Sequence, residues 1–381
     1  MSDFMPAAPL LLGFVVLPLL PRALRPLGII LAPALVFALL TQVDAGSVMT
    51  WPFLSYELVL NRVDRLSLAF GYVFAVAACL GGIYSYHLKD LGQQMATLLY
   101  IGAALVVVFA GDWLTLYVFW EIMAIASGWL ILSARTETSL QAGQRYLLMH
   151  LFGGVVLLAG ILWHFQQAGS LMFERLPVNG AAWLILVGVA VNAAIPPLHA
   201  WLADSYPEAT LTGSVFLSAF TTKAAVYVLA RAFPGWEFLA VTGTVMALYG
   251  VIFAVLENDI RRILSYHIVS QVGFMVAGVG LGSDTAINGS TAHAFAHILY
   301  KGLLFMAAGA VVHATGKRKL TELGGAIGEL RWVWVFYMFG ALSISGLPLL
   351  SGFVSKALVV YAAEIEHRDW MVMFLGVASV G

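Results

Sequence analysis

Long apolar runs follow one another along almost the whole chain, and they constrain its fold more than any other feature. A helix that crosses a bilayer needs about 20 mostly apolar residues, because a rise of about 1.5 Å per residue has to cover roughly 30 Å of hydrocarbon. Twelve runs qualify or nearly do so, and a thirteenth begins at Trp370. The twelve lie at about 7–20, 27–41, 66–86, 93–110, 112–133, 143–166, 181–201, 211–232, 236–257, 266–282, 290–314 and 331–361. They lack the alternation of barrel strands, so the sequence predicts an all-α integral membrane protein with about 12–13 transmembrane helices.

The composition agrees with a chain dissolved in lipid. Charged residues make up 10% and hydrophobic residues 61% of the chain, whereas a soluble protein carries about 25% charged residues. The net charge of -1 offers no basic stripe for a nucleic acid. The single Cys79 excludes an internal disulfide and a self-contained iron–sulfur cluster. We therefore expect the lipid bilayer as a partner, no nucleic acid, no cofactor or metal, and no catalytic centre of the chain's own.

The lysines and arginines between the runs indicate an orientation. Eleven of them lie in the odd-numbered connections and five in the even-numbered ones. Because cytoplasmic loops carry the excess of positive charge, we expect the odd connections in the cytoplasm of a bacterial-type cell and the N-terminus outside its inner membrane. The longest polar stretches, 42–64 and 316–331, are only as long as connections, so we expect one membrane domain over residues 1–381.

Four charged side chains lie inside the runs: Glu121, Lys223, Lys301 and Lys356. A charge near the bilayer centre costs several kcal/mol, so such a residue usually faces a water-filled path or a partner. For any single charge, a buried ion pair that sets helix register is the alternative. Four such charges in one chain favour an ion pathway.

Two histidines share a helix face with one of these lysines. His293, His297 and Lys301 are spaced i, i+4, i+8, which places them on one stripe roughly 12 Å long. A His-x-x-x-His pair can bind zinc, but it needs a third ligand, and Lys301 would repel a cation. Imidazoles titrate near neutral pH and can pass protons to a lysine. A proton-transfer stripe is the favoured interpretation, with metal binding and simple packing as alternatives.

Helix breakers interrupt two runs at membrane depth. They are Pro196 and Pro197 in the seventh run and Gly346, Pro348 and Gly352 in the twelfth. Carbonyls freed at that depth are tolerated only where they line a cavity or are buried in protein, and transporters place such interrupted helices at corresponding positions of two repeats. This spacing predicts five-helix repeats at 91–232 and 236–381, the second incomplete at its C-terminus, after N-terminal helices at 1–90. Ordinary proline kinks are the alternative.

With these residues in view, the chain resembles the antiporter-like membrane subunits that Mrp-type multisubunit cation/proton antiporters, respiratory complex I and membrane-bound hydrogenases share. The matching stretches are Arg62-Val-Asp-Arg-Leu-Ser-Leu, Glu121, Pro197-Leu-His-Ala-Trp-Leu-Ala-Asp204, Lys223-Ala-Ala-Val-Tyr, Asp259-Ile-Arg-Arg-Ile-Leu-Ser-Tyr, the stripe His293/His297/Lys301, and Gly352-Phe-Val-Ser-Lys356. They follow the family's order from about residue 62 to 361. The resemblance implies a fourteen-helix fold with two inverted five-helix repeats and broken seventh and twelfth helices.

The resemblance also implies roles for the charged residues. Glu121 would be the acid of a first half-channel, Lys223 the connecting base and Lys356 the exit-side lysine. The relay of the second half would consist of His293, His297 and Lys301.

One departure from the family's pattern bears on the first half-channel. Asn192 stands where the family has a lysine that pairs with the glutamate of the fifth helix. An asparagine can hydrogen-bond but cannot carry a proton. The first half-channel would then be crippled, hydrated differently, or served by Lys223 or His199.

The expected function is a proton-conducting subunit of a multisubunit Na+(K+)/H+ antiporter, most like the Mrp family's D-type member. It would relay H+ while a partner membrane subunit exchanges Na+ or K+. The first alternative is a proton-pumping subunit of a complex I-like NADH-quinone oxidoreductase or a hydrogenase, and the second is a transport-inactive structural subunit.

Overall fold

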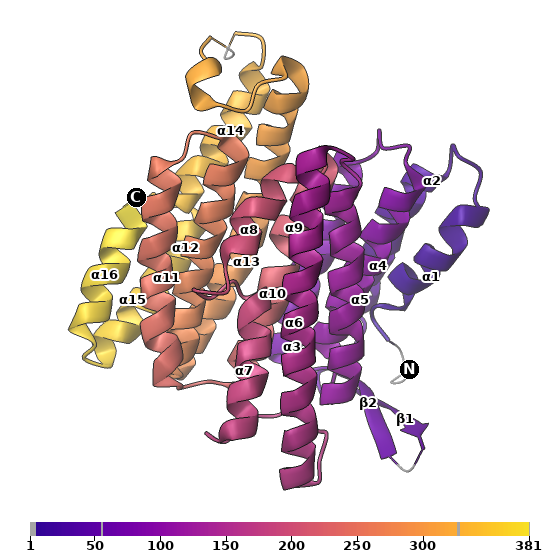
Figure 1. Ribbon diagram of the computed structural model, residues 1–381, viewed down its shortest axis with the longest axis vertical. Helices are drawn as coiled ribbons and strands as arrows, with labels where there is room; N and C mark the ends of the chain where they lie inside the picture. The colour runs from indigo at the N-terminus through magenta and orange to yellow at the C-terminus, as the bar shows by residue number, and fades with distance from the viewer. Residues whose placement is uncertain (1–4, 55, 326–327, 381) are drawn as a thin grey trace. The chain divides into compact units, whose positions relative to one another are not determined.

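The computed structural model of the chain describes residues 5–54, 56–325 and 328–380. Within these residues it contains sixteen α-helices, three short 3-10 helices and one two-stranded hairpin (Figure 1). Eight helical segments of the described residues are long and apolar enough to cross a membrane. The expected all-α, multi-pass membrane fold is confirmed.

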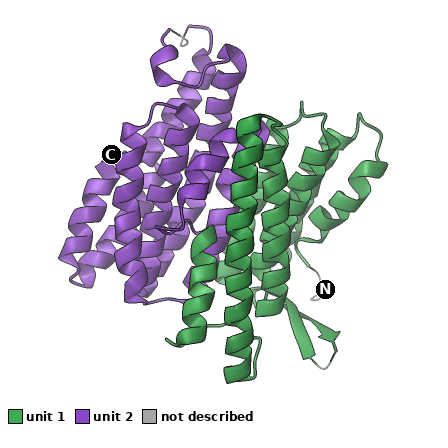
Figure 2. Cartoon of the chain, in the orientation of Figure 1, with its two compact units in different colours: residues 1–192 green, residues 193–381 purple. Residues whose placement is uncertain are grey.

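The chain divides into two compact units, a first unit of residues 1–192 and a second unit of residues 193–381 (Figure 2). The first unit contains α1 (Ala8–Val16), α2 (Arg25–Leu40), α3 (Arg65–Tyr84), α4 (Leu91–Phe109), α5 (Trp113–Leu132), α6 (Glu137–Ala168) and α7 (Gly180–Asn192). Each of these helices overlaps one of the first seven apolar runs. The 3-10 helix Leu17–Leu19 extends α1.

The second unit contains α8 (Ala200–Ser205), α9 (Leu211–Ala219), α10 (Thr221–Ala232), α11 (Glu237–Leu256), α12 (Ile260–Leu281), α13 (Asp284–Thr315), α14 (Arg331–Ile344), α15 (Ser351–Ile365) and α16 (Asp369–Val380). Two 3-10 helices, Tyr206–Glu208 and Leu320–Glu322, lie in its connections. The two units are defined by which residues contact one another. The five-helix repeats expected at 91–232 and 236–381 were defined by the order of the helices in the sequence, so the units do not test them. The repeats therefore remain a prediction.

Polar residues begin several of the long helices. Asp64 and Ser67 form a reciprocal capping box at the start of α3, and Thr136 and Ser139 form another at the start of α6. These side chains satisfy amide groups that the first turn of a helix leaves without intrahelical partners. These capping residues determine where α3 and α6 begin.

Both predicted helix breaks are confirmed. The seventh run divides between Asn192, the last residue of α7, and Ala200, the first of α8. The twelfth divides between Ile344 and Ser351, at the end of α14 and the start of α15. A third interruption separates α9 from α10 at Phe220, and the sequence did not predict it because no proline or glycine marks it.

A β-hairpin occupies most of the polar stretch 42–64, where the sequence predicted only a connection. Strands β1 (Val48–Phe53) and β2 (Tyr56–Arg62) pair antiparallel. The amide of Val59 donates to the Asp112 carboxylate over 2.8 Å, and the guanidinium of Arg62 donates to the Phe173 carbonyl over 2.7 Å. These bonds hold the hairpin against the start of α5 and against the connection between α6 and α7, all within the first unit.

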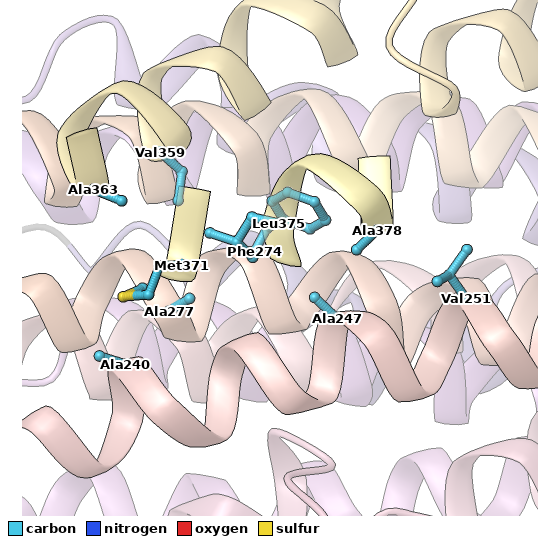
Figure 3. Packing of buried hydrophobic residues seen from close by; sticks show 10 residues of the cluster. All are labelled: Ala240, Ala247, Val251, Phe274, Ala277, Val359, Ala363, Met371, Leu375 and Ala378. Atoms are coloured by element: carbon cyan, nitrogen blue, oxygen red, sulfur yellow. The ribbon is translucent and has the colours of Figure 1, made fainter. Parts of the chain in front are cut away.

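Helices α11, α12, α15 and α16 share a buried apolar cluster in the second unit (Figure 3). Its residues are Ala240, Ala247, Val251, Phe274, Ala277, Val359, Ala363, Met371, Leu375 and Ala378. Small residues bring α11 and α12 together: a Cβ atom at Gly243 would lie only 2.7 Å from the Cα of Ala277. This close contact gives α12 a rigid support, and Phe274 of α12 reaches from it toward the polar residues described next.

Candidate functional site

Five ionisable side chains predicted for the site lie buried in the second unit. Lys223 on α10 and His293, His297 and Lys301 on α13 are fully buried, and Lys356 on α15 is 4% exposed. Helix α13 packs against α9, α10, α12, α14 and α15. The ion pairs described in this unit involve Arg262, Arg318 and Arg368, and no carboxylate of the described residues pairs with any of the five.

Lys223 lies at the interruption between α9 and α10. Its Nζ atom donates to the carbonyl oxygen of Ser218 over 2.6 Å. In a continuous α-helix that carbonyl would accept the amide of the residue four positions on. The interruption at Phe220 instead presents it to the lysine, which places the ammonium group beside backbone oxygen inside the protein.

Lys356 has the same kind of partner at the break in the twelfth run. Its Nζ atom donates over 2.6 Å to the carbonyl oxygen of Ile344, the last residue of α14. A Cβ at Gly352 would collide with the carbonyl group of Ser343, whose carbon is 2.9 Å from that position. The glycine thus lets the two halves of the broken run approach closely. Both lysines bind carbonyls that a helix end leaves unsatisfied.

His293 connects the stripe on α13 to α15. Its Nδ1 atom lies 2.9 Å from the Oγ atom of Ser355, whose hydroxyl donates to the Ser351 carbonyl. This contact ties the imidazole of His293 to α15, and its other ring nitrogen, Nε2, has no hydrogen-bond partner among the described residues. The centroid of the Phe274 ring lies 5.9 Å from the centroid of the His293 ring and 5.3 Å from Nζ of Lys356. The Phe274 ring is therefore a common neighbour of the imidazole and the ammonium group.

His297 and Lys301 continue the stripe deeper along α13. The rings of His293 and His297 are 6.2 Å apart between centroids. Neither ring nitrogen of His297, nor Nζ of Lys301, has a hydrogen-bond partner among the described residues. The Tyr300 ring meets His297 edge-on at 5.2 Å, and its hydroxyl donates to Gln271 on α12 over 3.4 Å. Buried polar groups such as these are the usual sites of ordered water.

Glu121 and Asn192 belong to the first unit. Glu121 on α5 is partly buried, and its carboxyl carbon lies 2.7 Å from where a Cβ of Gly154 on α6 would be. Asn192 ends α7 fully buried, and neither atom of its amide has a hydrogen-bond partner among the described residues. His199, in the second unit, meets the ring of Tyr249 edge-on at 4.5 Å.

The sequence reasoning missed the neutral residues around the charges. They are Ser218, Gln271, Phe274, Tyr300 and Ser355. Two of them could have been considered from the sequence, because Tyr300 directly precedes Lys301 and Ser355 directly precedes Lys356. Nothing in the local pattern distinguishes Ser218 or Phe274, since their roles arise from contacts across helices or across an interruption.

Comparison with solved structures identifies the fold. The chain aligns with a chain of the Mrp complex from Dietzia sp. DQ12-45-1b with a TM-score of 0.88 and 25% identity, covering 99% of this chain and 76% of the other. It also aligns with a chain of an archaeal membrane-bound sulfane sulfur reductase with a TM-score of 0.85 and 23% identity, covering 99% of this chain and 84% of the other.

Comparison of sequences identifies the family. The chain is 34% identical to the D-type subunit of the Na(+)/H(+) antiporter of Alkalihalophilus pseudofirmus over 280 residues, which are 68% of this chain and 56% of that protein. It is 31% identical to the A-type subunit from the same organism over 333 residues, 77% of this chain and 41% of that protein. The chain thus spans about half the length of the curated relatives it matches. Residues 110–380 match the family model for the transmembrane region of NADH:quinone oxidoreductase and Mrp antiporter proteins, and the chain belongs to this family.

Proposed function

We propose that this chain is a proton-conducting subunit of a multisubunit Na+(K+)/H+ antiporter. Its proton path would use Glu121, Lys223, His293, His297, Lys301 and Lys356. The relatives named as D-type and A-type subunits of Na(+)/H(+) antiporters support this assignment, as does the likeness to a chain of the Mrp complex.

One observation carries the proposal: cationic side chains are buried in one unit without a carboxylate partner. Lys223, Lys301 and both histidines are fully buried, and no described carboxylate pairs with them. An isolated charge inside a membrane protein is costly, and such residues mark ion or proton paths. A structural role would be served better by an ion pair or by apolar residues of similar volume.

The geometry supports a relay in which the end lysines are held and the middle groups exchange protons. Lys223 and Lys356 each bind a backbone carbonyl, at 2.6 Å. Nε2 of His293, both ring nitrogens of His297 and Nζ of Lys301 have no hydrogen bond within the described part of the chain that must be broken before a proton is taken up. A proton can then move from ammonium to imidazole and onward through ordered water.

The partners follow from the same assignment. Other membrane subunits of the complex would surround the chain, H+ would be its own cargo, and a partner subunit would exchange Na+ or K+. The excess of lysines and arginines in the odd connections supports a bacterial-type inner membrane with the N-terminus outside. The names of the relatives support a multisubunit assembly.

A redox-driven complex remains the alternative setting for the same relay. The family description includes NADH:quinone oxidoreductase, and the fold also matches a chain of a membrane-bound sulfane sulfur reductase. Mass spectrometry of the purified complex separates the two settings. Small antiporter subunits would support the antiporter, and quinone-reductase or hydrogenase subunits would support the alternative.

Proton flux in proteoliposomes that contain the whole complex tests the proposal. Lys223→Ala, Lys356→Ala and Glu121→Gln should each reduce flux, whereas Lys319→Ala should not, because Lys319 is exposed in a connection. If all three variants conduct like the unmodified complex, the relay is refuted and the structural-subunit interpretation is favoured. If only Glu121→Gln is silent, the first half-channel alone is lost.

A further inference from the structure

A line of polar side chains follows the contact between α5 and α6 in the first unit. The Oγ atom of Ser127 on α5 lies 2.7 Å from the hydroxyl of Tyr146 on α6. The Tyr146 ring is stacked on the ring of His150, with centroids 3.9 Å apart and an interplanar angle of 26°. Tyr146 is fully buried and His150 is 2% exposed. The apolar pattern of the sixth run gives no indication of this arrangement.

One hydrogen bond determines which nitrogen of His150 can exchange a proton. Nδ1 lies 2.9 Å from the carbonyl oxygen of Tyr146. A carbonyl oxygen can only accept, so Nδ1 carries the hydrogen. Nε2 is therefore the basic nitrogen, and the ring can gain or lose a proton there without losing its bond to the backbone.

The carboxylate of Glu121 lies one helical turn farther along the same face of α6. Gly154 is four residues beyond His150, so the two positions are neighbours on that face, about 5–6 Å apart. Glu121 occupies the space that a side chain at Gly154 would need. The absence of a side chain at Gly154 thus lets the Glu121 carboxyl group reach the face of α6 that carries His150.

The order of contacts along the two helices places His150 between Glu121 and the Ser127–Tyr146 pair. On α5, Glu121 contacts Gly154 of α6. Six residues farther along α5, Ser127 contacts Tyr146, which precedes Gly154 by eight residues on α6. The line therefore runs from Glu121 toward the connection that joins α5 to α6.

Titratable side chains of α5 and α6 face this line. Helix α6 packs against α5 and α7. From α5, the titratable groups on this side are Glu121 and, one turn before it, Tyr117. The buried end of α7 contributes Asn192, which cannot titrate. Tyr146 lies on α6 itself.

We propose that His150 and Glu121 form a proton-transfer site that supplies the first half of the path, in place of a lysine at position 192. The proton on Nε2 of the imidazolium moves to a carboxylate oxygen of Glu121, directly or through one water. The step leaves a neutral imidazole and a neutral carboxylic acid, and the reverse step restores both charges without any electron transfer. The inference rests on the proposed proton-conducting function.

Two substitutions at position 150 separate proton transfer from packing. His150→Phe keeps a flat ring to stack on Tyr146, and His150→Gln keeps a group that can donate to the Tyr146 carbonyl, but neither side chain titrates. His164→Phe is the matched control, because it makes the same change about 21 Å farther along α6. Proton flux is measured in proteoliposomes of the whole complex and divided by the amount of complex recovered.

Both substitutions at position 150 should lower proton flux at least fivefold, and His164→Phe should leave it unchanged. Adding Asn192→Lys to His150→Phe should restore at least half of the flux, because it returns a titratable group next to Val191, which lies against Gly153 on α6. The restored flux should persist to higher pH than that of the unmodified complex, since an amine holds its proton to higher pH than an imidazole. A purely structural role for His150 would not produce such rescue or such a shift.

The outcomes distinguish this inference from the proposed function. If Lys223→Ala reduces flux while His150→Phe and His150→Gln conduct normally, the role of His150 is refuted and the proposed function stands. If the position-150 variants lose flux but Asn192→Lys neither restores it nor changes its pH profile, His150 acts through packing and the inference is refuted. If Lys223→Ala, Lys301→Met and Lys356→Ala are all silent, the proposed function itself fails.

Discussion

His293 on α13 and Ser355 on α15 are joined by a side-chain hydrogen bond of 2.9 Å between Nδ1 and Oγ. Ser355 is the residue directly before Lys356, whose ammonium binds the last carbonyl of α14. The polar stripe of α13 is therefore coupled to the broken twelfth run through two adjacent residues. A movement of α15 would change the surroundings of the imidazole and of the ammonium group together.

Replacing Ser355 by alanine should weaken the relay without removing any titratable group. The substitution leaves Nδ1 of the buried His293 without its hydrogen-bond partner, which costs about 1–3 kcal/mol. If that cost falls on proton transfer, flux should fall by about tenfold for each 1.4 kcal/mol. The measurement is the initial rate of proton flux in proteoliposomes. Ser345→Ala is the control, because Ser345 follows the last residue of α14 and its hydroxyl donates to the carbonyl of Ala341 in that helix. Equal rates for both variants would contradict the role of Ser355.

Adding one methyl group at Gly352 should disrupt the broken twelfth run. A Cβ at this position would collide with the carbonyl group of Ser343 and push α14 and α15 apart. The bond from Lys356 to Ile344 should be lost with that displacement, and the complex should be recovered in lower amount and conduct less.

Gly302→Ala provides the matched control for that substitution. Gly302 lies on α13 beside Lys301, and nothing among the described residues lies within 4 Å of where its Cβ would be. This variant should accumulate and conduct normally. A Gly352→Ala complex that behaves like Gly302→Ala would show that the close approach at the break is not required.

Arg318 should stabilise the second unit through two carboxylates. Its Nε donates to Asp259 over 2.7 Å and its Nη2 to Glu208 over 3.0 Å. Burial opposes its charge, but the bonds and charges of Glu208 and Asp259 outweigh that effect and raise the pKa of Arg318 above its ordinary value. The guanidinium therefore stays charged across the working pH range.

Arg318→Ala should lower the stability of the complex by about 1–2 kcal/mol, after allowance for solvent screening at a site that is one-third exposed. The measurement is the midpoint of thermal unfolding in detergent. Arg331→Ala is the control, because Arg331 is exposed and has no ion pair among the described residues. An unchanged midpoint for Arg318→Ala would contradict the stabilising role.

The fold could be predicted because its signals are local. Hydropathy over about 20 residues locates each span, and Pro196 and Pro348 mark the two breaks because proline cannot supply a helical amide. The stripe His293, His297 and Lys301 needs only the helical period. The interruption at Phe220 was not predicted because no proline or glycine marks it. The hairpin was not predicted because the polar stretch 42–64 was interpreted as a connection.

The site could be predicted only as a set of charges. Their positions in the chain distinguish Lys223, Lys301 and Lys356 from the charges in connections. These positions do not predict which groups the lysines bind. The partners of Lys356 and His293 come from another helix, and the partner of Lys223 depends on an interruption. Contacts of this kind arise from packing, which no periodicity encodes. His150 could not be predicted for the same reason. It became a candidate only because Glu121 lies against Gly154, one turn from His150 on α6.

Substitution of Lys301 tests directly whether buried cations without a carboxylate partner carry the protons. Lys223 and Lys356 each hold a backbone carbonyl, so their removal also disturbs structure. Nζ of Lys301 has no hydrogen-bond partner among the described residues, so Lys301→Met removes the proton carrier while keeping an unbranched side chain of similar length. The complex should assemble in normal amount and its proton flux in proteoliposomes should fall to the level of empty vesicles. A Lys301→Met complex that assembles and conducts at the unmodified rate would contradict the account.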